Sequence, residues 1–190
     1  MSIARLYRRD AEGVLEFREA WFDVEDGEAT GQFVVNRGIA GHQSKTEEVK
    51  DVAADAGETL LDAFVEQCLE DGYAEIRPED QHWVIAQFAL KSVEGTQRDH
   101  YLEAKAAEAL RGFLGWRGLG TVESTDFAPR KLNIRILSPE PAKAVAAVKV
   151  CIKDADLDVT KLSIGVAPYA DPSALKQKHP LPAKAPFTLG

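Results

Sequence analysis

The stretch Asp55–Tyr73, DAGETLLDAFVEQCLEDGY, decides the fold class of the first half of the chain. Its apolar residues recur one and four positions apart, which places them on one face of a helix. They are Leu60, Leu61, Phe64, Val65, Cys68 and Leu69. Asp55, with Glu58 three residues later, is a candidate helix cap, and Gly72 is a candidate left-handed stop. A helix with one apolar face has to pack on another element of its domain.

Three segments before this helix predict the sheet on which it packs. They are rich in β-branched and aromatic residues and are separated by the turn-forming sequences DAEG and EDGEAT. The segments are IARLYRR (3–9), LEFREAWFDV (15–24) and GQFVVNRG (31–38). The charged segment SKTEEVKDVA (44–53) could supply a fourth strand. We therefore expect an antiparallel sheet with one helix, in a domain that covers residues 1–76.

The polar sequence RPEDQ (77–81) predicts a domain boundary, because the periodicities restart after it. The pattern that follows is strand, helix, strand, strand, helix, strand. The strands are expected at 82–91, 121–127, 131–137 and 161–169, and the helices at 98–114 and 139–154. This order defines the split βαβ, or ferredoxin-like, arrangement. We expect an α+β chain whose second domain, residues 80–170, is a ferredoxin-like βαββαβ sandwich.

The last segment, residues 171–190, is rich in Pro, Ala and Lys and shows no apolar periodicity. It is predicted to extend over the surface as a tail or to be mobile.

The composition is typical of a folded, soluble protein. Of 190 residues, 45% are hydrophobic and 28% are charged. Apolar stretches are far shorter than the roughly 20 residues that cross a bilayer, and no secretory signal is visible. We expect a cytoplasmic protein with no membrane partner. Cys68 and Cys151 lie in apolar patterns and are expected to be buried, reduced thiols.

The charge is distributed unevenly along the chain. The total is −8, but residues 1–76 hold seven Lys and Arg against eighteen Asp and Glu, a net charge of −11. Residues 77–190 carry the remaining +3. An acidic surface repels phosphates, so the first half is disfavoured as a nucleic-acid-binding surface.

The first half resembles the WGR module, a small sheet-plus-helix domain of poly(ADP-ribose) polymerases and of stand-alone bacterial proteins. The likeness covers roughly residues 3–76 and rests on FVV, on the Gly-rich turn RGIAGHQSK, on the amphipathic helix and on the closing pair Gly72-Tyr73. Where that family has Trp-Gly-Arg, the chain has Asn36-Arg37-Gly38. The tryptophan and arginine help polymerase members to engage DNA ends, so the resemblance implies a contact through Arg37 alone.

A second sequence, GWRG (115–118), contains similar letters directly after a predicted helix. Its glycines are typical of a helix stop and a turn, so we do not expect a second WGR site.

No catalytic constellation, cofactor motif or metal-ligand spacing is found in the sequence. The glycines before Lys45 do not match a P-loop, and the histidines are too dispersed for a local metal site. The candidate residues are therefore binding residues. They are Arg37, His42 and Lys45 around the Gly-rich turn, and Arg117, Arg130 and Lys131 in the more basic half.

Two functions follow from these observations. The first is a non-catalytic interaction or regulatory protein whose partner is another protein. The alternative is a nucleic-acid-binding accessory protein, with contacts from Arg37 and from the basic residues of the second half. A small-molecule enzyme with a cleft between the two domains is a third possibility, which the sequence neither supports nor excludes.

Overall fold

The structure is a computed structural model that describes residues 2–25, 27–183 and 185–190. The chain divides into two compact units. Unit 1 comprises Met1–Ile76 and Trp116–Gly118, and unit 2 comprises Arg77–Gly115 and Leu119–Gly190. Each unit contains one antiparallel sheet, and three α-helices pack on the two sheets. The expected α+β class is therefore confirmed.

Unit 1 contains a four-stranded sheet in the order β1-β2-β3-β4. Its strands are β1 (Ser2–Arg9), β2 (Leu15–Asp23), β3 (Thr30–Ile39) and β4 (Lys45–Ala53). All four expected segments form strands, including the charged one. β4 tolerates its charge because most of its side chains are exposed and only Val52 is buried.

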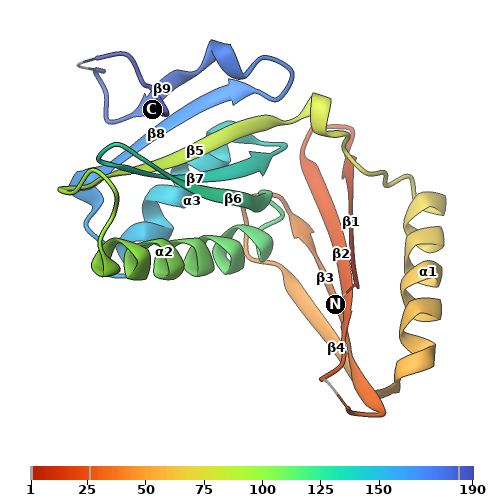
Figure 1. Cartoon of the computed structure of the whole chain (residues 1–190). Coiled ribbons are helices and arrows are strands. Elements are labelled where there is room, and N and C mark those ends of the chain that lie inside the picture. Colours follow the sequence, from red (N-terminus) through yellow and green to blue (C-terminus); the bar gives the residue numbers. More distant parts are fainter. Residues whose placement is uncertain (1, 26, 184) are drawn as a thin grey trace. The chain divides into compact units, whose positions relative to one another are not determined.

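Helix α1 (Ala54–Glu70) covers one face of this sheet (Figure 1). Two apolar clusters hold it there. The first contains Ala20, Phe22, Phe33 and Val52, with Leu61 and Phe64 packed against them. The second contains Leu6, Cys68 and Tyr73, with Phe64 and Val65 packed against them.

The predicted inner face of α1 is correct for four of its six residues. Leu60 and Leu69 are exposed, because they lie at the two borders of the apolar stripe.

The two ends of α1 differ from one another in how they are capped. The predicted cap at Asp55 is wrong, because β4 runs directly into the helix and the N-cap is Ala53, which offers no side-chain acceptor. Asp55 lies in the first turn instead, where its charge complements the helix dipole. At the other end, Gly72 has φ +81°. The amides of Gly72 and Tyr73 donate to the carbonyls of Leu69 and Cys68, so the predicted stop is a Schellman motif.

Unit 2 contains a five-stranded sheet in the order β6-β7-β5-β8-β9. Its elements are β5 (His82–Ala89), α2 (Gln97–Gly115), β6 (Thr121–Ala128), β7 (Lys131–Ser138), α3 (Pro141–Asp154), β8 (Leu162–Pro168) and β9 (Lys176–His179). Both helices pack on the same face of the sheet (Figure 1). Alternate residues of the central strands, such as Val84, Ala86 and Phe88, are buried beneath them.

The segment after residue 170 contains a strand that the sequence did not predict. β9 pairs antiparallel with the edge strand β8. Main-chain hydrogen bonds to an edge strand need no apolar periodicity, so the sequence carried no signal for it. The sequence predicts a tail that extends over the surface or is mobile, and within it residues 176–179 are extended as an edge strand.

The segment Trp116–Gly118 belongs to unit 1, whereas the sequence placed it in the second domain. Trp116 lies edge-on to Trp21 of β2, with ring centroids 5.9 Å apart. Gly118 lies against the ring of Phe17 with φ +57°, so no side chain is accommodated there. The predicted turn role of Gly118 is confirmed.

Two expectations from composition can be compared with the described residues. Within that part of the chain, no helix combines the length and apolar character that spanning a bilayer requires. Cys68 and Cys151 form no disulfide within the described residues, and both are buried, as expected.

Two helix glycines provide a matched test of the packing between α1 and its sheet. A Cβ at Gly57 would lie 2.2 Å from the Phe22 ring, whereas a Cβ at Gly112 of α2 would meet nothing within 4 Å. Gly57→Ala is expected to destabilise the protein by about 1–3 kcal/mol through overpacking. Gly112→Ala is expected to stabilise it by roughly 0.5–1 kcal/mol through helix propensity. Urea unfolding followed by circular dichroism measures both, and equal signs would contradict the packing described.

Candidate functional site

Three cationic residues stand side by side on three neighbouring strands of unit 1. Arg18 of β2 is paired with Arg37 of β3, and Arg37 is paired with Lys45 of β4. Residues directly opposite in an antiparallel sheet project from the same face. This row, Arg18–Arg37–Lys45, therefore lies on one face, and like charges in that position repel one another unless anions balance them.

The cationic row lies on the face that α1 covers, just beyond the end of the helix. Ala20 lies two residues after Arg18, and Val35 lies two residues before Arg37, so both share this face, and both pack in the core beneath α1. Beside the row is a cavity of about 540 Å³. Its lining residues are Glu16, Phe17, Arg18, Arg37, Gly38, Ile39, His42, Gln43, Lys45 and Tyr73.

Two of the three cations have anionic partners within unit 1. Arg18 forms an ion pair with Asp71, and Arg37 forms one with Glu47. Within the described part of the chain, the Lys45 side chain forms no hydrogen bond or ion pair. Lys45 is exposed and borders the cavity. Lys45, at the end of the row, is therefore a cation that has no anionic partner among the described residues.

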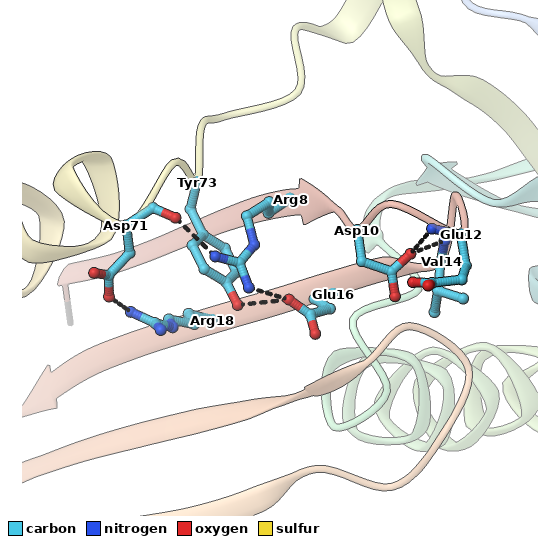
Figure 2. A network of polar contacts seen from close by, with 8 residues as sticks. All are labelled: Arg8, Asp10, Glu12, Val14, Glu16, Arg18, Asp71 and Tyr73. Atoms are coloured by element: carbon cyan, nitrogen blue, oxygen red, sulfur yellow. Dashed lines mark hydrogen bonds and ion pairs between the residues drawn. The ribbon is translucent and has the colours of Figure 1, made fainter.

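Tyr73 closes one side of the cavity through a polar network (Figure 2). Its hydroxyl donates to Glu16 Oε2 at 3.0 Å, and Arg8 Nη2 donates to the same oxygen at 2.7 Å. Arg8 Nη1 also donates to the carbonyl of Asp71 at 2.9 Å. The guanidinium carbons of Arg8 and Arg18 lie 4.6 and 4.3 Å from the centre of the Tyr73 ring.

The network shifts the pKa values of two of its members. The hydrogen bond from Arg18 lowers the pKa of the Asp71 carboxyl below its ordinary value. Burial, followed by the bond to the Glu16 carboxylate, raises the pKa of the Tyr73 hydroxyl. Asp71 is therefore an anion and Tyr73 a neutral hydrogen-bond donor near neutral pH.

The loop between β3 and β4 presents His42 and Gln43 to the cavity. Gly41 adopts φ +97°, a conformation that favours glycine, and its amide donates to the carbonyl of Arg117 at 2.8 Å. The amide of Ser44 donates to the carbonyl of Trp116 at 3.0 Å. The segment Trp116–Gly118 thus anchors this loop within unit 1.

The structure brings together only some of the residues that the sequence selected. Arg37, His42 and Lys45 border one cavity. Arg117 reaches the neighbouring loop through its main-chain carbonyl and is not a lining residue. Arg130 and Lys131 belong to unit 2, so they are not part of this site. Arg130 occupies the β6–β7 turn with φ +61°.

Sequence reasoning missed Glu16, Arg18 and Asp71 as members of the site. They come from β2 and from the end of α1, and only the sheet register places them beside Arg37. One feature of the sequence pointed to this part of the site. It was the pair Gly72-Tyr73, which forms part of the WGR resemblance, and Tyr73 lines the cavity.

Unit 2 has a cavity of its own, of about 560 Å³, between α3, β8 and β9. Its wall is mostly apolar, with Val145 and Val166 among its members, and Lys176 and Lys178 stand at its rim. His82 also lines this cavity. Its buried Nδ1 atom has no hydrogen-bond partner among the described residues. None of the residues selected from the sequence borders this cavity.

The described residues contain no group of three His, Cys, Asp or Glu side chains arranged to hold a metal ion. Comparisons of the chain with protein-family models, with curated proteins and with solved structures found no match.

The pKa of Asp71 tests the geometry of the network directly. Arg18→Ala removes the donor that lowers this pKa, so the value measured by carboxyl carbon NMR is expected to rise toward 3.8. Because the folded-state pKa is depressed, the pair stabilises the fold above about pH 4 and this contribution is lost as the pH falls through the folded value. Acid unfolding should therefore be less steep in Arg18→Ala. Lys50→Ala, on the exposed part of β4, is the control, and an unchanged Asp71 pKa in Arg18→Ala would contradict the pairing.

Proposed function

We propose that the chain is a cytoplasmic, non-catalytic interaction protein whose first unit binds an anionic group of a partner protein. The site is the cavity beside the cationic row, with Lys45 as the principal contact and His42 and Arg37 beside it. The group is a carboxylate or a phosphate, since both accept hydrogen bonds from ammonium and guanidinium donors. The two buried cysteines, which form no disulfide within the described residues, fit a reducing compartment.

The observation that carries this proposal is the incomplete charge balance of the row. Arg18 and Arg37 each have a carboxylate partner, and these two pairs leave the third position, at Lys45, without an anion. A ligand carboxylate or phosphate next to Lys45 would give this third cation an anionic partner, as Asp71 does for Arg18 and Glu47 does for Arg37. It would also relieve the repulsion between Lys45 and the directly opposite Arg37.

The surrounding charge favours a single anionic group over a polyanion. The cationic row is set in a segment, residues 1–76, whose net charge is −11. A long phosphate backbone would have to run over that acidic surface, whereas one carboxylate or phosphate needs only the cavity.

We further propose that unit 1 is a WGR-like domain and that unit 2 is a ferredoxin-like domain extended by β9. The four-stranded sheet with one helix and the Gly-rich loop after β3 support the first assignment. For unit 2, the support is the βαββαβ order together with the placement of β7 between β6 and β5.

The alternative, a nucleic-acid-binding accessory protein, is favoured by the gathering of Arg37, His42 and Lys45 at the position that corresponds to the DNA contact of WGR modules. Two observations weigh against it. The Arg37 guanidinium is already paired with Glu47. In unit 2, Phe88 is buried and one face of Trp83 is already stacked on Tyr169, so few aromatic faces are left to stack on a base.

Inorganic phosphate is a simple probe of the proposed site. We expect NMR shift titration at low salt to show saturable changes at the amides of Gly38, His42 and Lys45. Lys45→Ala should weaken binding by about tenfold, the effect of losing one charge-assisted hydrogen bond. Lys50→Ala, which removes another exposed lysine of the same strand, should leave it unchanged.

Three outcomes would contradict the proposal. The first is that neither phosphate nor acetate binds, and the second is that Lys50→Ala weakens binding as much as Lys45→Ala does. The third outcome is tight binding of a DNA duplex of about 20 base pairs at physiological salt that is lost in Lys45→Ala. This result would identify the partner as a nucleic acid and not a protein.

A further inference from the structure

The sheet of unit 2 carries a buried polar network on the face opposite α2 and α3. At its centre are Gln87 of β5 and Asn133 of β7, which are directly paired and only 8% and 0% exposed. Gln87 Nε2 donates to Asn133 Oδ1 at 2.7 Å, and Asn133 Nδ2 donates to Asp126 Oδ2 at 2.8 Å. Arg135 Nε donates to the other oxygen of Asp126 at 2.8 Å. The network fixes the orientation of both amides.

The last residues of the chain cross this network and present main-chain carbonyls to it. Gln87 Nε2 donates to the carbonyl of Thr188 at 2.9 Å, and Asn133 Nδ2 donates to that of Leu189 at 3.1 Å. Lys131 Nζ donates to the main-chain oxygens of Thr188 and Gly190, at 2.9 and 3.1 Å, and to Thr188 Oγ1 at 2.7 Å. Since most acceptors are main-chain oxygens, these contacts recognise an extended backbone.

Gly165 of β8 provides the one position that selects a side chain. A Cβ at Gly165 would lie 2.6 Å from the ring of Phe187, so the ring fills the space that a larger residue would occupy. Gly165 is paired with Ile85, two residues from Gln87 along β5. The terminal segment therefore runs across β8, β5 and β7, and it contacts the sheet through side chains of the sheet, without forming a strand ladder.

These contacts are shallow, and the surface beneath them suits a reversible interaction. Phe187 and Leu189 are only half-buried, and Thr188 and Gly190 are exposed. If the segment leaves, the amides of Gln87 and Asn133 and the ammonium of Lys131 can donate to water instead. The hydrogen bonds among Gln87, Asn133 and Asp126 do not involve the segment, so the surface is expected to stay organised for a replacement.

We infer that this face is a binding surface for an extended segment of a partner protein that contains an aromatic residue. The surface is defined by Gln87, Lys131, Asn133 and Gly165, and the chain's own residues 187–190 occupy it as a built-in ligand. The partner segment places its aromatic ring on Gly165 and its next main-chain carbonyls on the three donors. Binding in trans thus competes with the terminal segment, independently of the site in unit 1.

The test uses a chain that ends at Ala183 and a fluorescein-labelled peptide, Ala-Pro-Phe-Thr-Leu-Gly, which copies residues 185–190. Fluorescence anisotropy is expected to show saturable binding to the shortened chain. Binding to the full chain should be at least about tenfold weaker, because the attached segment competes at high effective concentration. The same peptide with Ala in place of Phe should lose most of its affinity.

Gly165→Ala in the shortened chain is the matched variant, since the added methyl group fills the ring position while the backbone there needs no glycine. It is expected to weaken peptide binding by about tenfold or more, whereas Lys176→Ala, on the exposed edge of β9, should not. If the shortened chain does not fold, the full chain with Phe187→Ala replaces it. A folded protein of either kind that binds no peptide, or that binds the Ala peptide equally well, overturns the inference.

Discussion

Tyr73 lies between the end of α1 and the charged side chains of the sheet. Its position determines which part of the sheet of unit 1 the helix leaves uncovered. The Schellman motif at Gly72 ends α1 and turns the chain back toward the sheet. Two guanidinium groups lie over the Tyr73 ring and its hydroxyl donates to Glu16, while Ala74 exchanges main-chain hydrogen bonds with Tyr7. These cation–π contacts and hydrogen bonds together hold the helix end in place. Because α1 stops there, the sheet beyond it remains uncovered and its side chains are charged.

Both units face the same physical problem, since helices cover only one face or part of one face of each sheet. In unit 1, the uncovered end of the helix-bearing face is filled by ion pairs, and Lys45 is left over. In unit 2, the face without helices carries a hydrogen-bonded network, and the terminal segment supplies its last acceptors. On both surfaces, charged or hydrogen-bonding side chains stand where no helix covers them, so a ligand can take the place of water or of the terminal segment. This common feature underlies both proposals.

The sequence predicted regular elements well and spatial neighbours poorly. Helix and strand periodicities located α1, α2, α3 and eight strands, because these patterns reflect burial on one face. The cap at Ala53 and the strand β9 carry no side-chain signal, so they could not be found in this way. The candidate site was half predicted: the Gly-rich turn indicated Arg37, His42 and Lys45, which are close in sequence. Arg18 and Asp71 join them only through strand register and the helix end, which composition and spacing do not encode.

The central claim is that the cavity beside Lys45 receives a single tetrahedral or carboxylate anion. A crystal structure of the protein soaked in sodium selenate tests it most directly, because selenium can be located by its anomalous scattering. We predict an anomalous peak in the cavity within hydrogen-bonding distance of Lys45 Nζ, with the pairs Arg18–Asp71 and Arg37–Glu47 retained. Selenate bound at exposed cations such as Lys50 but absent from the cavity would contradict the account.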